Sequence, residues 1–347
     1  MLASPLAKPL SLAGAAVLWI GIPTMTPWSS GTWTTSPGSA SGASCAGCHF
    51  QAGPSIDSSR TSLVADAGVH ALSAGQSISV TTSLDASGAN QTHGGFLCET
   101  DAGTFTAGAN TQTGSTNNTI AVSHVNSSAR SWTYTFNAPA TPGLVELTAA
   151  GMSPNGDGLA FSVAGDYMSF SGYDKTATSA TPLRLYVLPN GVTNVGTACP
   201  DAYGNTSVLG ANEEPNPGDA GFELRLHGAA PGEAAFLWGA IGANNAFSQS
   251  LDGLGVTGCT SYIQSVDATQ VATTSAGSAQ RADGSVAFAL PIPNNPALIG
   301  TTYHFQAGYC DPSVNSGFSG LPNGSPVLAA ARSLDLSLTN ALEVTVQ

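Results

Sequence analysis

The sequence predicts an all-β protein with two antiparallel β-sandwich domains in tandem. Charged residues make up only 8% of the 347 residues, and 41 glycines and 21 prolines interrupt the chain. Between these turn residues, short stretches alternate apolar and polar side chains with a period of two, which is typical of strands with one buried face. A chain of this length is large enough for two hydrophobic cores.

The N-terminus, residues 1–30, is predicted to be a signal peptide. Lys8 precedes an apolar run, Leu10–Ile22, that is too short for a stable membrane anchor. We place the cleavage site between Thr24 and Ala40. The mature chain is therefore expected in the periplasm or outside the cell, without a membrane span.

Residues 31–69 are predicted to form a polar arm followed by a haem-binding loop, with a helical turn or two in the part 55–69. The loop contains Cys45, Cys48 and His49 in the pattern C-x-x-C-H, which is the attachment motif of a c-type haem. Two thiols at this spacing add to the vinyl groups of one porphyrin, and the adjacent imidazole binds the iron as proximal ligand. One covalent haem c is expected. A zinc half-site and a plain Cys45–Cys48 disulfide are the alternatives.

The first sandwich is predicted over residues 70–190. Apolar residues alternate in Ile78–Leu84, Trp132–Phe136 and Leu183–Val187, and these stretches read as strands. The residues Leu188–Gly191 (Leu-Pro-Asn-Gly) predict the turn by which the chain leaves this domain.

The second sandwich is predicted over residues 191–347. Its strands are indicated by the alternation in Phe222–Leu226, Val286–Leu290, Leu334–Leu338 and Leu342–Val346. The last of these runs to the end of the chain, so we expect it to be part of a sheet.

Four cysteines remain outside the haem motif, and an oxidising compartment would pair them. Of the three connectivities, we prefer Cys199–Cys259 with Cys98–Cys310.

The charge balance limits the partners. Eight Lys and Arg stand against 21 Asp and Glu, giving a net charge of -13, and no basic cluster occurs. Nucleic acid is therefore not expected as a partner, because binding it requires clustered cations. A redox partner protein or further copies of the chain are expected instead. No hydrolase motif stands out. The chain is predicted to be an electron carrier and not an enzyme, with a haem enzyme or gas sensor as the alternative.

Several short motifs lie within residues 40–170: Gly94-Gly95-Phe96, Asp101–Phe105, Ser123-His124-Val125, Trp132–Pro139, Val145–Gly158 and Gly165-Asp166. They resemble the choice-of-anchor V or Reeler-like domain proteins, exported bacterial proteins with an N-terminal C-x-x-C-H before a single β-sandwich. The resemblance implies a Reeler-like fold for residues 70–190. This sequence departs from the family pattern at Cys98 and Met152. The second domain resembles a β module that recurs in large secreted bacterial proteins.

The distal iron ligand is expected to be His124, because the resemblance places a histidine in the strand before the Trp132 strand. His93, His70 and Met152 are the alternatives. A second imidazole would give a low-potential electron carrier, a thioether a higher potential, and an open site a haem enzyme or gas sensor. Without the resemblance, a strand histidine is more often simply hydrogen-bonded.

The function predicted from the sequence is that of an exported monohaem c-type cytochrome that transfers one electron at a time, as part of an extracellular assembly or as a shuttle. The alternative is a secreted structural or adhesive β-sandwich protein in which the C-x-x-C-H loop holds no haem.

Overall fold

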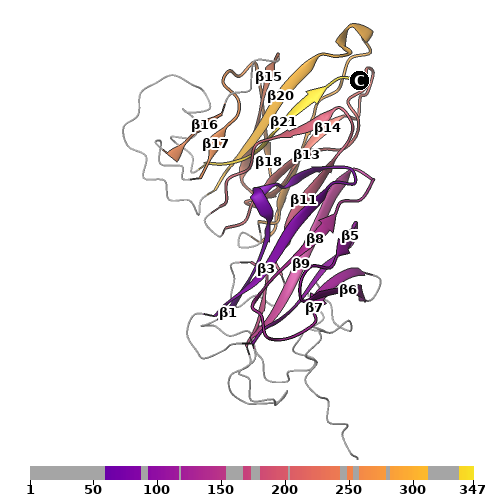
Figure 1. Cartoon of the computed structure of the whole chain (residues 1–347). Coiled ribbons are helices and arrows are strands. Elements are labelled where there is room, and N and C mark those ends of the chain that lie inside the picture. Colours follow the sequence, from indigo (N-terminus) through magenta and orange to yellow (C-terminus); the bar gives the residue numbers. More distant parts are fainter. Residues whose placement is uncertain are drawn as a thin grey trace, which may run out of the picture.

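The structure, a computed structural model, describes residues 59–86, 93–116, 119–153, 167–172, 180–201, 204–242, 248–252, 258–278, 282–311 and 336–347. These residues form a mainly antiparallel all-β molecule, which confirms the predicted fold class (Figure 1). Short 3-10 turns occur at η2 (Asp66–Gly68) and η5 (Pro296–Leu298). No helix within these ranges is long and apolar enough to cross a membrane.

Two facing sheets form the first half of the molecule. One sheet has the strand order β1 (Ser59–Ala65), β3 (Ser77–Ala86), β8 (Ser131–Asn137) and β5 (Thr104–Thr106). The other has the order β2 (Ala71–Ser73), β11 (Leu183–Leu188), β9 (Gly143–Ser153), β4 (Gly95–Thr100), β7 (Thr119–His124) and β6 (Thr111–Thr116), with β10 (Tyr167–Phe170) paired to β9. A common apolar core between the sheets makes them a sandwich.

The core of the first half is built by the alternating residues that the sequence singled out. Trp132, Tyr134 and Phe136 on β8 are all buried. They pack against the facing sheet, where the Phe96 ring lies 4.8 Å from the Trp132 ring between centroids. Burial of these large side chains contributes apolar area that stabilises this half.

The segment 55–69 was expected to contain a helical turn or two, and in its described part η2 is one such turn, whereas the strand β1 was not predicted. Residues Ser59–Ala65 form a strand at the edge of the smaller sheet, antiparallel to β3, and only η2 is helical. The reason is a short period-two pattern, in which Thr61 and Ala65 are buried and Val64 is exposed. Pairing with β3 fixes this register.

The second half contains three smaller sheets. The largest has the order β12 (Val192–Val195), β21 (Leu336–Thr345), β20 (Thr302–Cys310), β15 (Ala234–Ile241) and β18 (Ala268–Thr273). The others are β13 (Val208–Ala211), β14 (Glu223–Ala229) and β19 (Gly284–Ala289), and the pair β16 (Gln249–Ser250) and β17 (Thr260–Ser261). The two predicted C-terminal strands are one strand, β21, which is tied into the sheet between β12 and β20.

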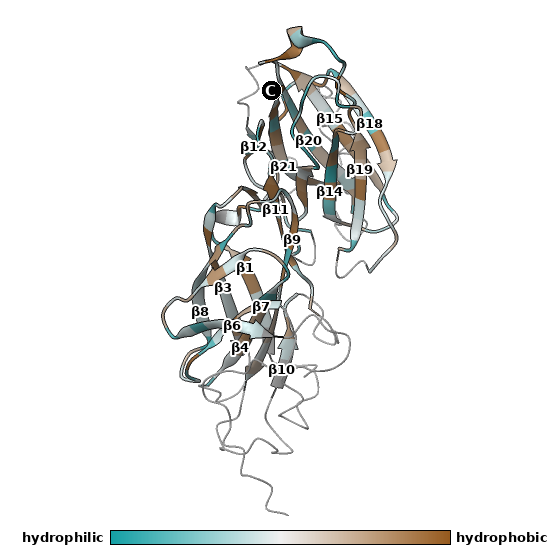
Figure 2. Ribbon diagram, turned by 90° about the vertical axis from the view of Figure 1, so that its right-hand side faces the viewer, coloured by the Kyte–Doolittle hydropathy of each residue, from teal (hydrophilic) through white to brown (hydrophobic). Residues whose placement is uncertain are grey.

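β11 is buried on both faces and links the two halves. Leu185 and Val187 belong to the core of the first half, whereas Tyr186 and Leu188 belong to the core of the second. The Tyr186 ring lies so close to β13 that a Cβ at Gly210 would be 2.2 Å from it. The chain then turns as predicted, with Val192 N donating to Pro189 O at 3.2 Å, and enters β12 (Figure 2).

The disulfide Cys199–Cys259 is present, which confirms that part of the predicted pairing. The expected Cys98–Cys310 bridge is wrong, because Cys98 lies in the core of the first half and Cys310 ends β20 in the second. Burial raises the pKa of the Cys98 thiol to about 12, so this side chain is a protonated core residue.

Candidate functional site

The haem motif residues Cys45, Cys48 and His49 lie outside the described residues, as do the predicted signal peptide and the polar arm. The described chain begins with β1 at Ser59.

The start of β1 lies at the same end of the first half as His124. Thr61 Oγ1 donates to Ser169 O at 3.1 Å, and Ser169 on β10 is opposite Gly151 on β9. Gly151 is in turn opposite Phe96 on β4, and the ring of His124 contacts the backbone of Phe96. The fold therefore brings the predicted distal ligand, His124, to the same end of the first half as the start of β1.

His124 is the last residue of β7 and is 9% exposed. Its Nδ1 lies 3.0 Å from Phe96 N and 3.1 Å from Phe96 O. Gly95 makes room for the ring, since a Cβ there would lie 2.6 Å from His124 Cε1. Burial lowers the pKa of His124, more than the hydrogen bond to Phe96 raises it, so the imidazole is neutral near pH 7.

A neutral imidazole with this surrounding fits the requirements of an iron ligand. When Nδ1 donates its proton to Phe96 O, the lone pair of Nε2 is available for a metal. When Nδ1 instead accepts from Phe96 N, Nε2 carries the proton and cannot bind a metal. The backbone of Phe96 permits both tautomers, so His124 can act as an iron ligand in one of them but not in the other.

The other predicted ligands are divided between the two ends of the first half. Met152 on β9 is opposite Gly95 and packs with Phe170 in an apolar cluster. The half-buried His93 lies two residues before the first residue of β4, at the same end. His70 lies after β1 and η2, beside β2, and is therefore at the opposite end of the strand.

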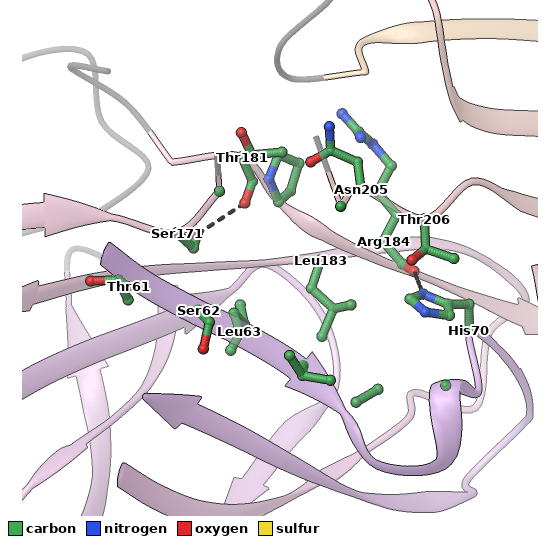
Figure 3. Close-up of a pocket in the computed structure, with 16 residues that line it drawn as sticks. Thr61, Ser62, Leu63, His70, Ser171, Thr181, Leu183, Arg184, Asn205 and Thr206 are labelled. Atoms are coloured by element: carbon green, nitrogen blue, oxygen red, sulfur yellow. Dashed lines mark hydrogen bonds between the residues drawn. The ribbon is translucent and has the colours of Figure 1, made fainter. Parts of the chain in front are cut away.

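A cavity of about 330 Å³ lies beside His70, at the junction of the two halves (Figure 3). It is lined by β1, by the residues leading into β11, and by a loop of the second half. The lining residues are Thr61 to Ala65, Gly68, His70, Ser171, Gly172, Thr181 to Arg184, and Gly204 to Thr206.

Arg184 connects the halves at the same junction. Its Nε donates to Glu146 Oε1 on β9 at 3.0 Å, and its Nη2 donates to Asp283 Oδ1 of the second half at 3.1 Å. Nearby, His227 has a pKa lowered to about 4, first by burial and then by the positive charges of Arg184 and Arg225. Arg184 is not among the site residues predicted from the sequence, although a lone arginine inside an apolar strand indicates a buried ion pair.

Among the residues that the structure describes, no group of three or more His, Cys, Asp and Glu side chains is placed to hold a metal ion.

Comparison with known proteins gives structural similarities only. No protein-family model matches the chain, and no curated protein matches it in sequence. The Reelin-N domain of F-spondin is 20% identical with a TM-score of 0.29, over 41% of this chain and 96% of that one. The human F-spondin reeler domain is 18% identical with a TM-score of 0.27, over 37% of this chain and 89% of that one. The adhesin InvE of Yersinia pseudotuberculosis is 16% identical with a TM-score of 0.21, over 83% of this chain and 58% of that one.

These structural neighbours are β domains, two of them Reeler domains, and at such TM-scores they assign no function to this chain. Membership of the choice-of-anchor V family stays a prediction.

Proposed function

We propose that the chain is a secreted structural or adhesive β-sandwich protein in which the two halves act as one rigid unit. The observation that carries this proposal is the double-faced strand β11. Tyr186 and Leu188 fill the core of the second half, Leu185 and Val187 fill the first, and Arg184 adds an ion pair to each half. A large apolar contact of this kind suppresses relative motion of neighbouring domains, which suits a load-bearing or surface-presenting role.

Secretion is supported by the Cys199–Cys259 disulfide. Structural disulfides form and persist in oxidising compartments and are rare in the cytosol. The periplasm or the extracellular space, as expected from residues 1–30, is thus the proposed location.

The proposal is tested on protein exported from a host that matures c-type cytochromes. The expected result is a β-rich protein that unfolds in one transition in urea and shows no haem band when reduced in alkaline pyridine. Two well-separated transitions would contradict a single rigid unit. A c-type haemochrome band at one haem per chain would overturn the structural role and establish the second candidate.

The second candidate is a monohaem c-type cytochrome, and the geometry of His124 favours it. In this role Cys45 and Cys48 would hold the porphyrin, His49 would be the proximal ligand, and His124 would be the distal one. Phe96 O would accept the Nδ1 proton and orient the His124 ring. A bound haem supplies one-electron chemistry, and a redox protein or a further copy of the chain would be the electron partner.

The ligand assignment is tested by His124→Ala in matured protein. The expected result is conversion of a low-spin visible spectrum to a high-spin one. His304→Ala is the matched control, because His304 is a buried strand histidine of the second half and should leave the spectrum unchanged. An unaltered spectrum in His124→Ala would transfer the assignment to His93, Met152 or His70.

A further inference from the structure

The cavity at the junction of the halves contains a histidine whose proton position is fixed by its surroundings. His70 Nδ1 lies 3.1 Å from the carbonyl oxygen of Arg184. A carbonyl only accepts hydrogen bonds, so Nδ1 carries the proton. Burial lowers the pKa of His70, which keeps the ring neutral, and Nε2 is then a hydrogen-bond acceptor. His70 lines the cavity and offers this acceptor to a ligand (Figure 3).

Three hydroxyl groups add to this acceptor. Ser62 lies on β1, Thr181 precedes β11, and Thr206 belongs to the loop of the second half. Hydroxyls both donate and accept, so together with His70 they form a set of neutral hydrogen-bonding groups. Other hydroxyls of the lining serve the fold: Thr61 bonds to Ser169 across β1 and β10.

The cavity has no uncompensated charge among its lining residues. Arg184 is the one cationic side chain in the lining, and it is already paired with the carboxylates of Glu146 and Asp283. His70 is neutral. An anionic or cationic ligand would therefore have no counter-charge here, and its desolvation would oppose binding.

The rest of the lining is aliphatic. Leu63, Pro182 and Leu183 provide apolar surface beside the hydroxyl groups. A volume of about 330 Å³ is at the lower end of the range of about 300–1,000 Å³ for small-molecule sites. The ligand must then be small, neutral, rich in hydroxyl groups, and apolar on one face.

We propose that this cavity binds the end of a neutral saccharide, with His70 Nε2 and the hydroxyls of Ser62, Thr181 and Thr206 as its hydrogen-bonding partners. A pyranose ring has hydroxyls around its rim and C–H groups on its faces, which matches the polar and aliphatic parts of the lining. This proposal rests on the proposed adhesive role, and the saccharide is the partner to which the protein would adhere.

The test is saturation-transfer NMR of the exported protein with the methyl α-pyranosides of glucose, galactose and mannose at millimolar concentration. Saturation transfer to at least one of them is expected, with a dissociation constant obtained by titration. No transfer to any of the three would overturn the proposal.

Two variants place the binding in this cavity. Thr206→Val removes one hydroxyl at constant shape and should weaken binding about tenfold, the effect of one lost hydrogen bond. Ser62→Phe fills the cavity and should abolish binding. Thr193→Val on the exposed side of β12 is the matched control and should bind as the unaltered protein does. Unchanged affinity in both cavity variants would show that the saccharide binds elsewhere and would overturn the assignment.

The result of the saccharide-binding experiment is independent of the haem measurement. Saccharide binding without a haemochrome band supports both proposals, and a haemochrome band together with cavity-dependent binding overturns only the structural role. Absence of binding in a haem-free, cooperatively folded protein removes the saccharide site alone.

Discussion

The two ends of the first sandwich each hold one buried histidine, and the difference between them lies in the backbone. At the junction end, His70 Nδ1 lies 3.1 Å from the carbonyl oxygen of Arg184, so Nε2 is an acceptor. At the opposite end, His124 Nδ1 lies between the N–H and the carbonyl of Phe96, so either ring nitrogen can carry the proton. The two histidines are buried to a similar extent. In His70 the proton is held on Nδ1, whereas in His124 the proton position depends on what binds beside the ring.

At the junction end, the largest effect on stability is expected from Tyr186→Ala. The ring fills the space above Gly210, and its loss leaves a cavity between the halves. We expect a loss of about 3–5 kcal/mol in the free energy of unfolding, measured in urea. Val271→Ala, at a side chain that is 65% exposed, is the control and should cost little. A small effect of Tyr186→Ala would mean that the junction is not a packed core.

Arg184→Met is the next test. Methionine keeps much of the buried volume but removes both ion pairs, and the partner carboxylates are 44% and 30% exposed, so water can solvate them. We therefore expect a loss of about 2 kcal/mol, below the usual cost of leaving a charge fully buried. The same urea titration should also show a lower slope if the halves begin to unfold separately. A variant as stable as the parent would show that the apolar contact alone joins the halves.

A half-buried histidine, His227, makes the junction sensitive to acid. Its folded pKa is about 4, below the ordinary 6.5, so the unfolded chain binds the proton more readily. Stability is then fully present above pH 6.5 and falls as the pH decreases toward 4, by about 3 kcal/mol for this group. His70 and His124, whose pKa values are also lowered, act in the same direction. His227→Gln should reduce the slope of stability against pH in this window, and an unchanged slope would contradict the assignment.

The smallest effect concerns the proton positions themselves. In haem-free protein at pH 7.5, nitrogen NMR of the imidazoles should show His70 with its proton on Nδ1 only. His124 should show intermediate shifts, because both forms are allowed by Phe96. A single form for both histidines, or a proton on Nε2 of His70, would remove the difference between the two ends.

Local sequence patterns were sufficient for much of the fold. The alternation of Trp132, Tyr134 and Phe136 predicts β8, and that of Leu183, Leu185 and Val187 predicts β11, because a half-buried strand leaves a period-two trace. β1 was missed because its pattern is short and includes a polar residue, Thr61, on the buried face.

The junction could not be predicted in the same way. The partners of Arg184 lie 38 and 99 residues away in the chain, and no local pattern indicates that Glu146 and Asp283 meet it. The second buried face of β11 could not be predicted for a similar reason, since Tyr186 is covered by strands that follow it in the sequence. Likewise, Cys98 could be counted as a candidate for a disulfide, but only the register of β4 shows that it points into the core.

The shared strand has a consequence for how the chain can be divided. The sequence alone predicts a domain boundary after residue 190, where a Pro-Asn-Gly turn ends the first sandwich. A fragment ending there would retain β11 and present Tyr186, Leu188 and Ala71 to water, since the residues that cover them lie in the second half. The fragment beginning at residue 191 would have an open core on the matching side. Each piece alone would expose an apolar strip to water, so we expect neither half to be stable without the other.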